Sequence, residues 1–502
     1  MATTAASSRA SLAASLIPGL SLLALAALFA SWACFQQFGG YDLSPLIDAF
    51  WRIRIGQVPG VDFINTFPPL IYLSAKLAAL VDLGWYELTA TAILHTSAAF
   101  VMVMGMTPPA QRTPQRSITV AAVLSLPLLY TNHLWHSSSS QLIGAIFVYA
   151  LHRSVVAART TTGDLVWIAG GSALLVLAKQ NVALPLLALG VVAVLFTGDG
   201  RRWPSLGAMI AGTIVGLVAG LSLVGMSLAG FAATYTAVVG RGMPNASIWH
   251  GTAQIGSSLL VIGAIAGALA FMGSRLLQRH TVRERGTQLL ILLLPAVLYP
   301  LATDWDAKMN DAVLPMFLVC CWAWSDAQER AAKAEAADLN PLILIIGFLL
   351  LTAMAMGFTR ERMYHVGPGT FWEANADHRI AAGYLAGMHS GPRLDRVLQE
   401  EHQLRRAHPA SSLFFGPRLE FSYRELHAPP PRDLPLWWHP GSSYAVGDES
   451  RIIHAFAAQH IDYLVFLGDD RTRMPLRLLR YIDKGYRQLP GRGELQVFKR
   501  LH

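Results

Sequence analysis

Charged residues are scarce in this chain. They account for 14% of its 502 residues, whereas 53% are hydrophobic and the mean hydropathy is +0.41. A soluble domain of this length does not hold so much apolar material in one core. The composition therefore excludes an ordinary soluble enzyme and predicts a protein that crosses the membrane many times.

Cysteine is also rare, with three residues in the whole chain. Cys34 lies in the first apolar run, and the adjacent Cys320 and Cys321 lie in a later one. A disulfide between neighbouring residues would be strained, and two thiols alone are too few for a zinc site. Because no cysteine follows residue 358, we expect this part of the chain to fold without disulfides.

A glycine-rich nucleotide loop followed by Lys-Ser or Lys-Thr is missing, which argues against an ATP-driven pump. The formal net charge is +8, but much of this excess lies in short loops between apolar runs. Orientation in the membrane and contact with anionic lipids explain basic residues at such places. We therefore expect membrane lipids, and no nucleic acid, among the partners.

Long apolar runs are abundant. A helix needs about 20 mostly apolar residues to cross roughly 30 Å of hydrocarbon, and about eleven segments are candidates. They predict an all-α polytopic membrane core over residues 1–358, with the first run as an uncleaved anchor. The predicted spans are residues 15–35, 87–106, 117–131, 141–151, 165–178, 182–197, 204–229, 256–273, 288–303, 311–325 and 341–358.

Arginines indicate the orientation of these spans. They cluster in every second short loop, for example at Arg112 and Arg116 and at Arg201 and Arg202, and positive loops stay in the cytoplasm. The N-terminus is then cytoplasmic, and an odd number of spans places the first loop and the C-terminal residues outside. This orientation requires that residues 67–83 form a surface helix rather than a span.

Residues 359–502 lack long apolar runs and predict a small soluble α/β domain that faces outward. Within it, Trp437 and Trp438 belong to a proline-rich loop. This loop either contacts a glycan or the membrane interface, or wraps over the domain. The predicted strands are residues 412–415 and 462–467, and the segments with helical periodicity are residues 372–388 and 474–484.

The loop after the first span, residues 41–69, concentrates charge beside the membrane surface. Asp42 follows the end of the span by a few residues, so its carboxylate can face a lipid headgroup and a soluble acceptor together. A carboxylate within hydrogen-bond reach of a hydroxyl can remove its proton as the oxygen attacks an activated carbon. Asp42 is therefore the predicted general base, and Asp48 is a predicted substrate-binding residue.

Three arginines and a lysine are candidate partners of a phosphate group. Arg52 and Arg54 share an amphipathic stretch with Asp48, and guanidinium groups bind phosphate oxygens in pairs. Lys179 lies between two predicted spans, and Arg241 lies in a long outer loop. Other interpretations stay open: Arg52 and Arg54 bind bulk anionic headgroups or pair with Asp48, and Lys179 snorkels to the interface.

The predicted outer loop at residues 303–311 holds a second polar cluster. Asp304, Asp306 and Lys308 lie there beside a tryptophan. They could hold a sugar by hydrogen bonds and stacking, hold a divalent cation, or form a salt-bridged hairpin. Because the ligand spacing of a calcium loop is missing, we predict substrate binding here and no cofactor, with a divalent metal left open.

The order of residues in the first loop carries a family resemblance. Asp42 is followed by Asp48-Ala-Phe-Trp-Arg, then by Asp62-Phe63, then by Phe67-Pro-Pro-Leu. This pattern resembles the first outer loop of the glycosyltransferase-C superfamily. The resemblance implies surface helices in this loop, a polyprenyl-phosphate sugar donor, and an acidic residue, here Asp42, that acts on the acceptor. It also implies a structural or substrate-binding role, as an acceptor contact, for Asp62. Leu43 departs from the Asp-Glu pair of several subfamilies, which leaves the substrate open.

The residues and the resemblance lead to one functional expectation. We expect a membrane glycosyltransferase of the inverting type that moves a sugar from a polyprenyl-phosphate donor to an acceptor hydroxyl. The sequence does not specify the sugar. The acceptor is expected to be an outward-facing glycan, lipid or protein, in the envelope of a bacterium whose inner membrane holds the enzyme. The alternatives are a translocator of lipid-linked glycans, which would place its ionisable residues along a path inside the bundle, or a non-catalytic envelope-assembly protein.

Overall fold

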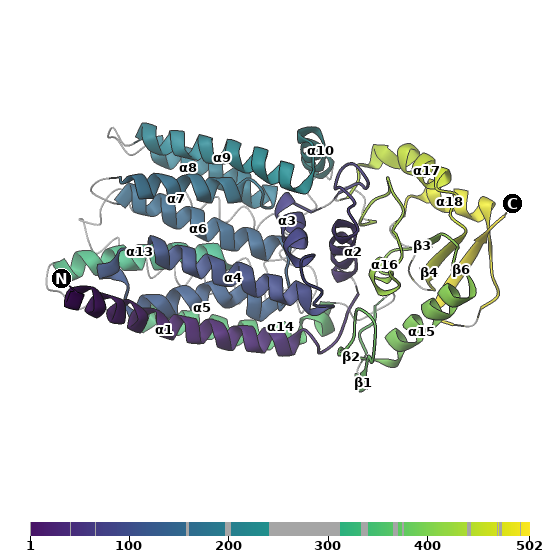
Figure 1. The fold of residues 1–502 in the computed structure, drawn as a ribbon, viewed down its shortest axis with the longest axis horizontal. Helices are drawn as coiled ribbons and strands as arrows, with labels where there is room; N and C mark the ends of the chain where they lie inside the picture. The colour runs from purple at the N-terminus through teal and green to yellow at the C-terminus, as the bar shows by residue number, and fades with distance from the viewer. Residues whose placement is uncertain are drawn as a thin grey trace. The chain divides into compact units, whose positions relative to one another are not determined.

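The structure is a computed structural model, and the chain divides into two compact units (Figure 1). The first unit comprises Met1–Ala33, Leu88–Val218 and Asn245–Thr359. The second unit comprises Cys34–Glu87, Ala219–Pro244 and Arg360–His502, so it contains the first outer loop as well as the C-terminal residues. The structure describes residues 2–40, 42–65, 67–156, 160–195, 202–239, 312–332, 340–364, 370–373, 376–438, 443–468, 470, 474–491 and 493–501.

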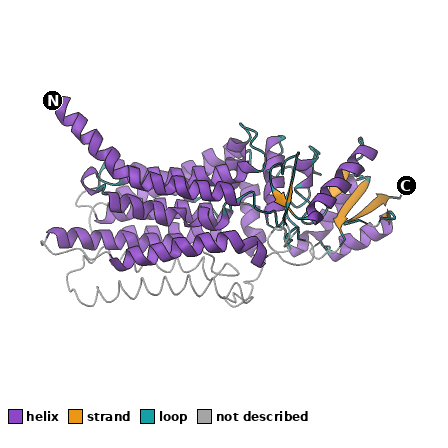
Figure 2. Ribbon diagram, turned by 90° about the horizontal axis from the view of Figure 1, so that it is seen from below, coloured by secondary structure: helices purple, strands orange, loops and turns teal. Residues whose placement is uncertain are grey.

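The first unit is helical, and its long helices run side by side in both views (Figures 1 and 2). Helix α5 packs against α1 and α13, and α6 packs against α7, α8 and α13. The elements, some of which extend into the second unit, are α1 (Ala2–Ala33), α4 (Tyr86–Met106), η1 (Pro109–Gln111), α5 (Pro114–Thr131), α6 (His136–Val156), α7 (Thr162–Leu175), α8 (Gln180–Leu195), α9 (Arg202–Val224), α13 (Val313–Ala332) and α14 (Asn340–Tyr364).

These helices correspond to the predicted spans. Each predicted span in the described part of the chain overlaps a helix, and residues 204–229 overlap both α9 and the start of α10 (Leu228–Val239). Residues 256–273 and 288–303 lie outside the described residues. Three described helices are long and apolar enough to cross a membrane: Ala14–Ala33, Tyr86–Met106 and Arg202–Val224. The helical, apolar character of the core is therefore confirmed, and the number of eleven crossings stays a prediction.

Small residues let α7 and α9 approach each other closely. A Cβ atom added to Gly212 would lie 2.1 Å from the carbonyl oxygen of Ala169, and one added to Gly216 would lie 2.3 Å from that of Ala173. Residues four apart share one face of a helix. Such small-residue faces are typical of helix pairs in membranes, where apolar side chains gain nothing by leaving the lipid.

The second unit contains all the strands of the described residues (Figure 2). Its four-stranded sheet has the order β3-β4-β6-β5, in which β3 pairs parallel with β4 and the other pairs are antiparallel. Its elements are α2 (Leu43–Arg54), α3 (Pro69–Ala78), α10 (Leu228–Val239), β1 (His378–Arg379), β2 (His389–Ser390), α15 (Pro392–Ala407), β3 (Leu413–Phe415), α16 (Ser422–Glu425), η3 (Val446–Asp448), α17 (Glu449–Ala458), β4 (Tyr463–Leu467), α18 (Leu476–Gly485), β5 (Tyr486–Gln488) and β6 (Leu495–Arg500).

An apolar core joins one face of this sheet to α17 and α18. Leu464 and Phe466 alternate along β4 and share that face, and they belong to one buried cluster with Phe456 of α17 and Leu478 of α18. The predicted strands at 412–415 and 462–467 and the predicted helix at 474–484 correspond to β3, β4 and α18.

The helix suggested by the periodicity of residues 372–388 is wrong. The described residues there form β1 and a series of turns that leads to β2. Gly383 and Gly387 have φ angles of +91° and +86°, which a right-handed helix cannot contain. The apolar spacing came instead from residues such as Tyr384 and Leu385, which are buried although they lie in turns.

Helix α3 shows that residues 67–83 do not form a membrane-crossing helix. It contains 10 residues, so it is about 15 Å long, half of what the hydrocarbon requires. Pro69 occupies its first turn, as the Pro-Pro sequence predicted, and Lys76 is exposed. The assumption on which the predicted orientation depends is therefore supported, although the orientation itself stays a prediction.

The proline-rich loop wraps over the second unit, which was one of its two predicted interpretations. Trp438 is 2% exposed in the sheet core, and Trp437 stacks on Phe67 with 6.4 Å between ring centroids. The backbone N–H of Ile64 donates to the carbonyl of Leu434 at 3.0 Å. These contacts fasten residues 431–438, hereafter the strap, to the first outer loop.

Candidate active site on the first loop

Asp42 lies in the N-cap position of α2, and the helix behind it is held firmly. Eleven of the twelve residues of α2, Leu43–Ile53, are buried. The half-buried Asp42 side chain does not cap its own helix and, among the described residues, makes no hydrogen bond or ion pair. The positive end of the helix dipole favours a carboxylate here. Asp42 is thus a well-positioned carboxylate whose oxygens can accept from a ligand.

The first turn of α2 is fixed by a contact to the C-terminal part of the chain. The Ser44 hydroxyl donates to Oε2 of Glu420 at 2.6 Å and accepts the backbone N–H of Phe421 at 3.0 Å. Burial raises the pKa of the Glu420 carboxyl to about 8, although the Ser44 hydrogen bond lowers it. Since Ser44 is two residues from Asp42, this contact also restrains the predicted base.

Arg52 forms an internal ion pair and does not face outward. Its Nε atom donates to Oδ2 of Asp48 at 2.8 Å, and its Nη1 atom donates to Gln57 and to the carbonyl of Pro431. The arginine is 2% exposed, and its guanidinium lies 5.1 Å from the ring centroid of Phe63. Burial raises the pKa of Asp48 to about 6, against the effect of Arg52. The predicted alternative, pairing with Asp48, is the contact observed.

Arg54 ties three helix ends together. Its Nη2 atom donates to Oε2 of Glu87 at 2.8 Å and to the carbonyls of Ala78 at 3.0 Å and Val81 at 3.2 Å. A cation is favourable at the C-terminal end of α3, where carbonyl groups lack helical partners. The Tyr384 hydroxyl donates to the other oxygen of Glu87 at 3.2 Å. Phosphate binding by Arg54 stays a prediction, and its observed contacts are structural.

Asp62 stabilises the turn that follows α2. Its Oδ2 atom accepts the backbone N–H of Val58 at 2.8 Å, and its Oδ1 atom lies 3.4 Å from Nη1 of Arg432 in the strap. The backbone carbonyl of Asp62 accepts the N–H of Asp433 at 2.7 Å. The carboxylate therefore shapes the loop and joins it to the strap, while a role in substrate binding is untested.

Lys179 lies in the first unit, between α7 and α8. Its Nζ atom donates to the Ser137 hydroxyl at 3.0 Å, and its backbone N–H donates to the Ser140 hydroxyl at 2.8 Å.

No group of three or more metal-ligating side chains occurs among the described residues. Four predicted site residues lie outside the described part of the chain: Arg241, Asp304, Asp306 and Lys308.

The sequence analysis missed a buried polar segment, Glu420–Glu425, that supports the site. All its residues are buried. The Arg424 guanidinium lies 4.9 Å from the ring centroid of Trp51 and pairs with Asp82 at 2.7 Å, while the Trp51 indole donates to the carbonyl of Ala428 at 2.8 Å. Its one sequence signal is the close mixture of charged and aromatic residues, which is unusual for a solvated surface.

Comparison with solved structures identifies the fold. ArnT from Cupriavidus metallidurans in the apo state matches with a TM-score of 0.53 and 13% identity, over 95% of this chain and 97% of that one. This chain has the fold of ArnT. At this identity the likeness concerns the fold, and it agrees with the polytopic helical core that the sequence predicted.

Other comparisons add less. The archaeal oligosaccharyltransferase AglB from Archaeoglobus fulgidus, solved with an inhibitory peptide and a dolichol-phosphate, is 11% identical, with a TM-score of 0.43 over 89% of this chain and 69% of that one. No family model and no curated protein matches the sequence. The ArnT fold is therefore established by structure alone.

Proposed function

We propose that the protein is a membrane glycosyltransferase that moves a sugar from a polyprenyl-phosphate donor to a hydroxyl of an outward-facing acceptor. The observation that carries the proposal is the difference between Asp42 and its neighbours. Asp48 and Asp62 are engaged in internal contacts, whereas Asp42 makes none among the described residues. The ArnT fold and the apolar helices support a membrane enzyme of this type.

In the proposed reaction the Asp42 carboxylate accepts the proton of the acceptor hydroxyl. The hydroxyl oxygen attacks the anomeric carbon of the donor sugar from the face opposite the phosphate, so the new carbon–oxygen bond forms with inversion. The bond from that carbon to the phosphate oxygen breaks, and its electron pair leaves with the polyprenyl phosphate. General base catalysis of this kind contributes about 10²–10⁴-fold to a rate.

Charge on the departing phosphate needs a cation or hydrogen-bond donors. Arg52 is a poor candidate, since it is buried and its guanidinium pairs with Asp48. Lys179 is half-buried and its ammonium group donates to a neutral hydroxyl, Ser137. Arg54, Lys179 and Arg241 stay the proposed partners of the phosphate.

A reconstituted transfer assay tests the base. Full-length protein in liposomes receives a panel of polyprenyl-phosphate sugars and an extract of envelope acceptors, and sugar transfer is measured for the wild type and Asp42→Asn. We expect Asp42→Asn to lower the transfer rate by about 10²-fold or more, because an amide cannot take the proton. Asp483→Asn, which changes an exposed carboxylate of α18, is the matched control, and we expect it to keep most of the rate.

The same assay separates the proposal from its alternatives. Undiminished transfer by a well-folded Asp42→Asn protein would reject Asp42 as the base. Faster flipping of the lipid-linked sugar across the liposome, with no transfer by the wild type, would show a translocator. Loss of transfer on adding a chelator would contradict a metal-independent reaction.

A further inference from the structure

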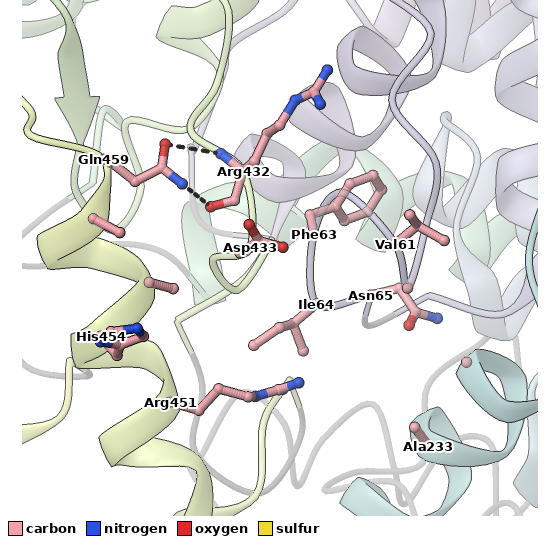
Figure 3. A pocket seen from close by; sticks show the side chains of 14 residues that line it. Val61, Phe63, Ile64, Asn65, Ala233, Arg432, Asp433, Arg451, His454 and Gln459 are labelled. Carbon is pink, nitrogen blue, oxygen red and sulfur yellow. Dashed lines mark hydrogen bonds between the residues drawn. The ribbon is translucent and has the colours of Figure 1, made fainter.

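A cavity of about 620 Å³ lies within the second unit, beside the strap (Figure 3). One wall is the loop after α2, with Phe63 and Ile64, and the wall across from it is α17. The α17 residues that line it are Arg451, His454, Ala455 and Ala458, whose spacing puts them on one face of that helix. Ligand sites in proteins have roughly 300–1,000 Å³, so this cavity can hold a sugar with a charged substituent.

The cavity is rich in cationic side chains. Arg432 and Arg451 line it together with His454, against one carboxylate, Asp433. The ion pairs of the two arginines are long, 3.4 Å to Asp62 and 3.7 Å to Asp448. Both guanidinium side chains are more than 60% exposed, and exposed ion pairs of this kind contribute little to stability. An anionic ligand in the cavity can therefore bind the guanidinium of Arg451 at small cost, whereas that of Arg432 points away from Arg451 (Figure 3).

The polar groups between the cations suit hydroxyl groups. Asp433 is exposed at the cavity and Asn65 supplies an amide, so the site has both acceptors and donors. The Gln459 side chain accepts the backbone N–H of Arg432 and donates to its carbonyl, which holds the strap against α17 (Figure 3). A purely anionic ligand would gain nothing from Asp433, whereas a sugar that bears one acidic group uses both kinds of contact.

The cavity is remote from the predicted base. Arg52, in the last turn of α2, contacts Phe63 and the carbonyl of Pro431, so the cavity adjoins the C-terminal end of that helix. Asp42 is at the other end, ten residues away, and an α-helix rises about 1.5 Å per residue. About 15 Å therefore separates the two ends. A group bound in the cavity belongs to a part of the substrate other than the reacting hydroxyl.

We propose that this cavity binds an acidic sugar, one that carries a phosphate or a carboxylate, as a distal part of an extended acceptor. The proposal rests on the glycosyltransferase function, since it assigns the acceptor class of that enzyme. Binding energy from a remote part of a substrate can be used to position the reacting group. Arg451, which reaches from α17 toward Ile64, holds the anion, and Asp433 and Asn65 contact the hydroxyl groups (Figure 3).

Direct binding tests the proposal without requiring transfer. Full-length Asp42→Asn protein in nanodiscs of neutral phosphatidylcholine is titrated calorimetrically with glucose 6-phosphate, glucuronate, glucose and inorganic phosphate. We expect the two acidic sugars to bind at least about tenfold more tightly than glucose or phosphate, and Arg451→Gln to weaken their binding about tenfold. Arg477→Gln, an exposed arginine of α18, is the matched control and should bind as before.

Each other outcome overturns the assignment. Equal affinity for glucose and the acidic sugars would show that the acidic group does not contribute to binding. Equal affinity for inorganic phosphate and the acidic sugars would show that the sugar does not contribute. Unchanged affinity in Arg451→Gln would place any binding elsewhere. Loss of acidic-sugar binding in nanodiscs of anionic lipid assigns the cavity to a lipid headgroup. The titration contains no sugar donor, so its result does not depend on whether the protein catalyses transfer.

Discussion

Three aspartates of the first loop have three different surroundings. Asp42 is half-buried at a helix N-terminus, Asp48 is fully buried with Arg52, and Asp62 accepts a backbone N–H in a turn. By residue type alone, the three aspartates are equal candidates for a general base. Their surroundings decide which carboxylate can take a proton from a substrate. Because Asp48 is fully buried, its carboxylate is out of reach of a substrate hydroxyl.

Buried carboxyl groups should make the second unit less stable in alkali. Burial raises the pKa of both Glu420 and Glu401 to about 8, so the folded protein keeps protons that the unfolded chain releases near pH 4.5. The unfolded state then binds fewer protons between about pH 4.5 and 8, and stability falls as the pH rises through this window. We expect the unfolding temperature of purified protein to be lower at pH 8.5 than at pH 5.5.

The Glu420→Gln variant isolates one contribution to that pH dependence. The glutamine side chain keeps an oxygen that can accept the hydrogen bond of Ser44, but it does not ionise. The unfolding temperature of this variant should therefore fall less between pH 5.5 and 8.5 than that of the wild type. Asp483→Asn removes a carboxylate from the exposed side of α18 and serves as the control. An identical pH slope for Glu420→Gln and the wild type would contradict the prediction.

At the scale of elements, close helix contact in the first unit depends on two glycines. Gly212→Val should separate α7 from α9, because any Cβ at this position would overlap the backbone of Ala169. Overpacking of this kind costs about 1–3 kcal/mol. We expect a lower unfolding temperature and a smaller monodisperse fraction in size-exclusion chromatography.

Gly207→Val provides the matched control for Gly212→Val on the same helix. An added Cβ at Gly207 meets no atom within 4 Å, so the same substitution changes helix propensity without creating an overlap. Equal loss of stability in the two variants would show that the α7–α9 contact is not the cause.

Elements with local signals were predictable, and elements fixed by distant partners were not. The Pro-Pro start of α3 and the strands β3 and β4 were predicted from nearby residues, and the pairing of Arg52 with Asp48 was one of the alternatives left open. The burial of Glu420–Glu425 depends on residues that lie more than 300 positions earlier in the chain. Such contacts leave no periodicity, so sequence alone could not place this segment beside the candidate base.

At the scale of the whole molecule, the first loop and the C-terminal residues form one folding unit. A chain that ends at Phe358 would lack Glu420, Ala428 and Pro431, which contact Ser44, Trp51 and Arg52. We expect trypsin to cleave this shortened chain after Arg52 and Arg54, at bonds that the full chain protects.

Limited proteolysis followed by mass spectrometry measures this protection. Cleavage after Arg112, in the connection between α4 and α5, is the internal reference, because the shortened chain keeps that connection. Equal protection of Arg52 and Arg54 in the two chains would show that α2 is stable without the C-terminal residues.

The contact between the Trp51 indole and the Ala428 carbonyl also has a consequence for biosynthesis. The two residues are 377 positions apart, and ribosomes add about 5–20 residues per second. Helix α2 is therefore made roughly 20–80 s before its partner exists. During that interval its apolar face has to be shielded by lipid or by a chaperone, so the yield of active protein should depend on how quickly translation reaches the end of the message.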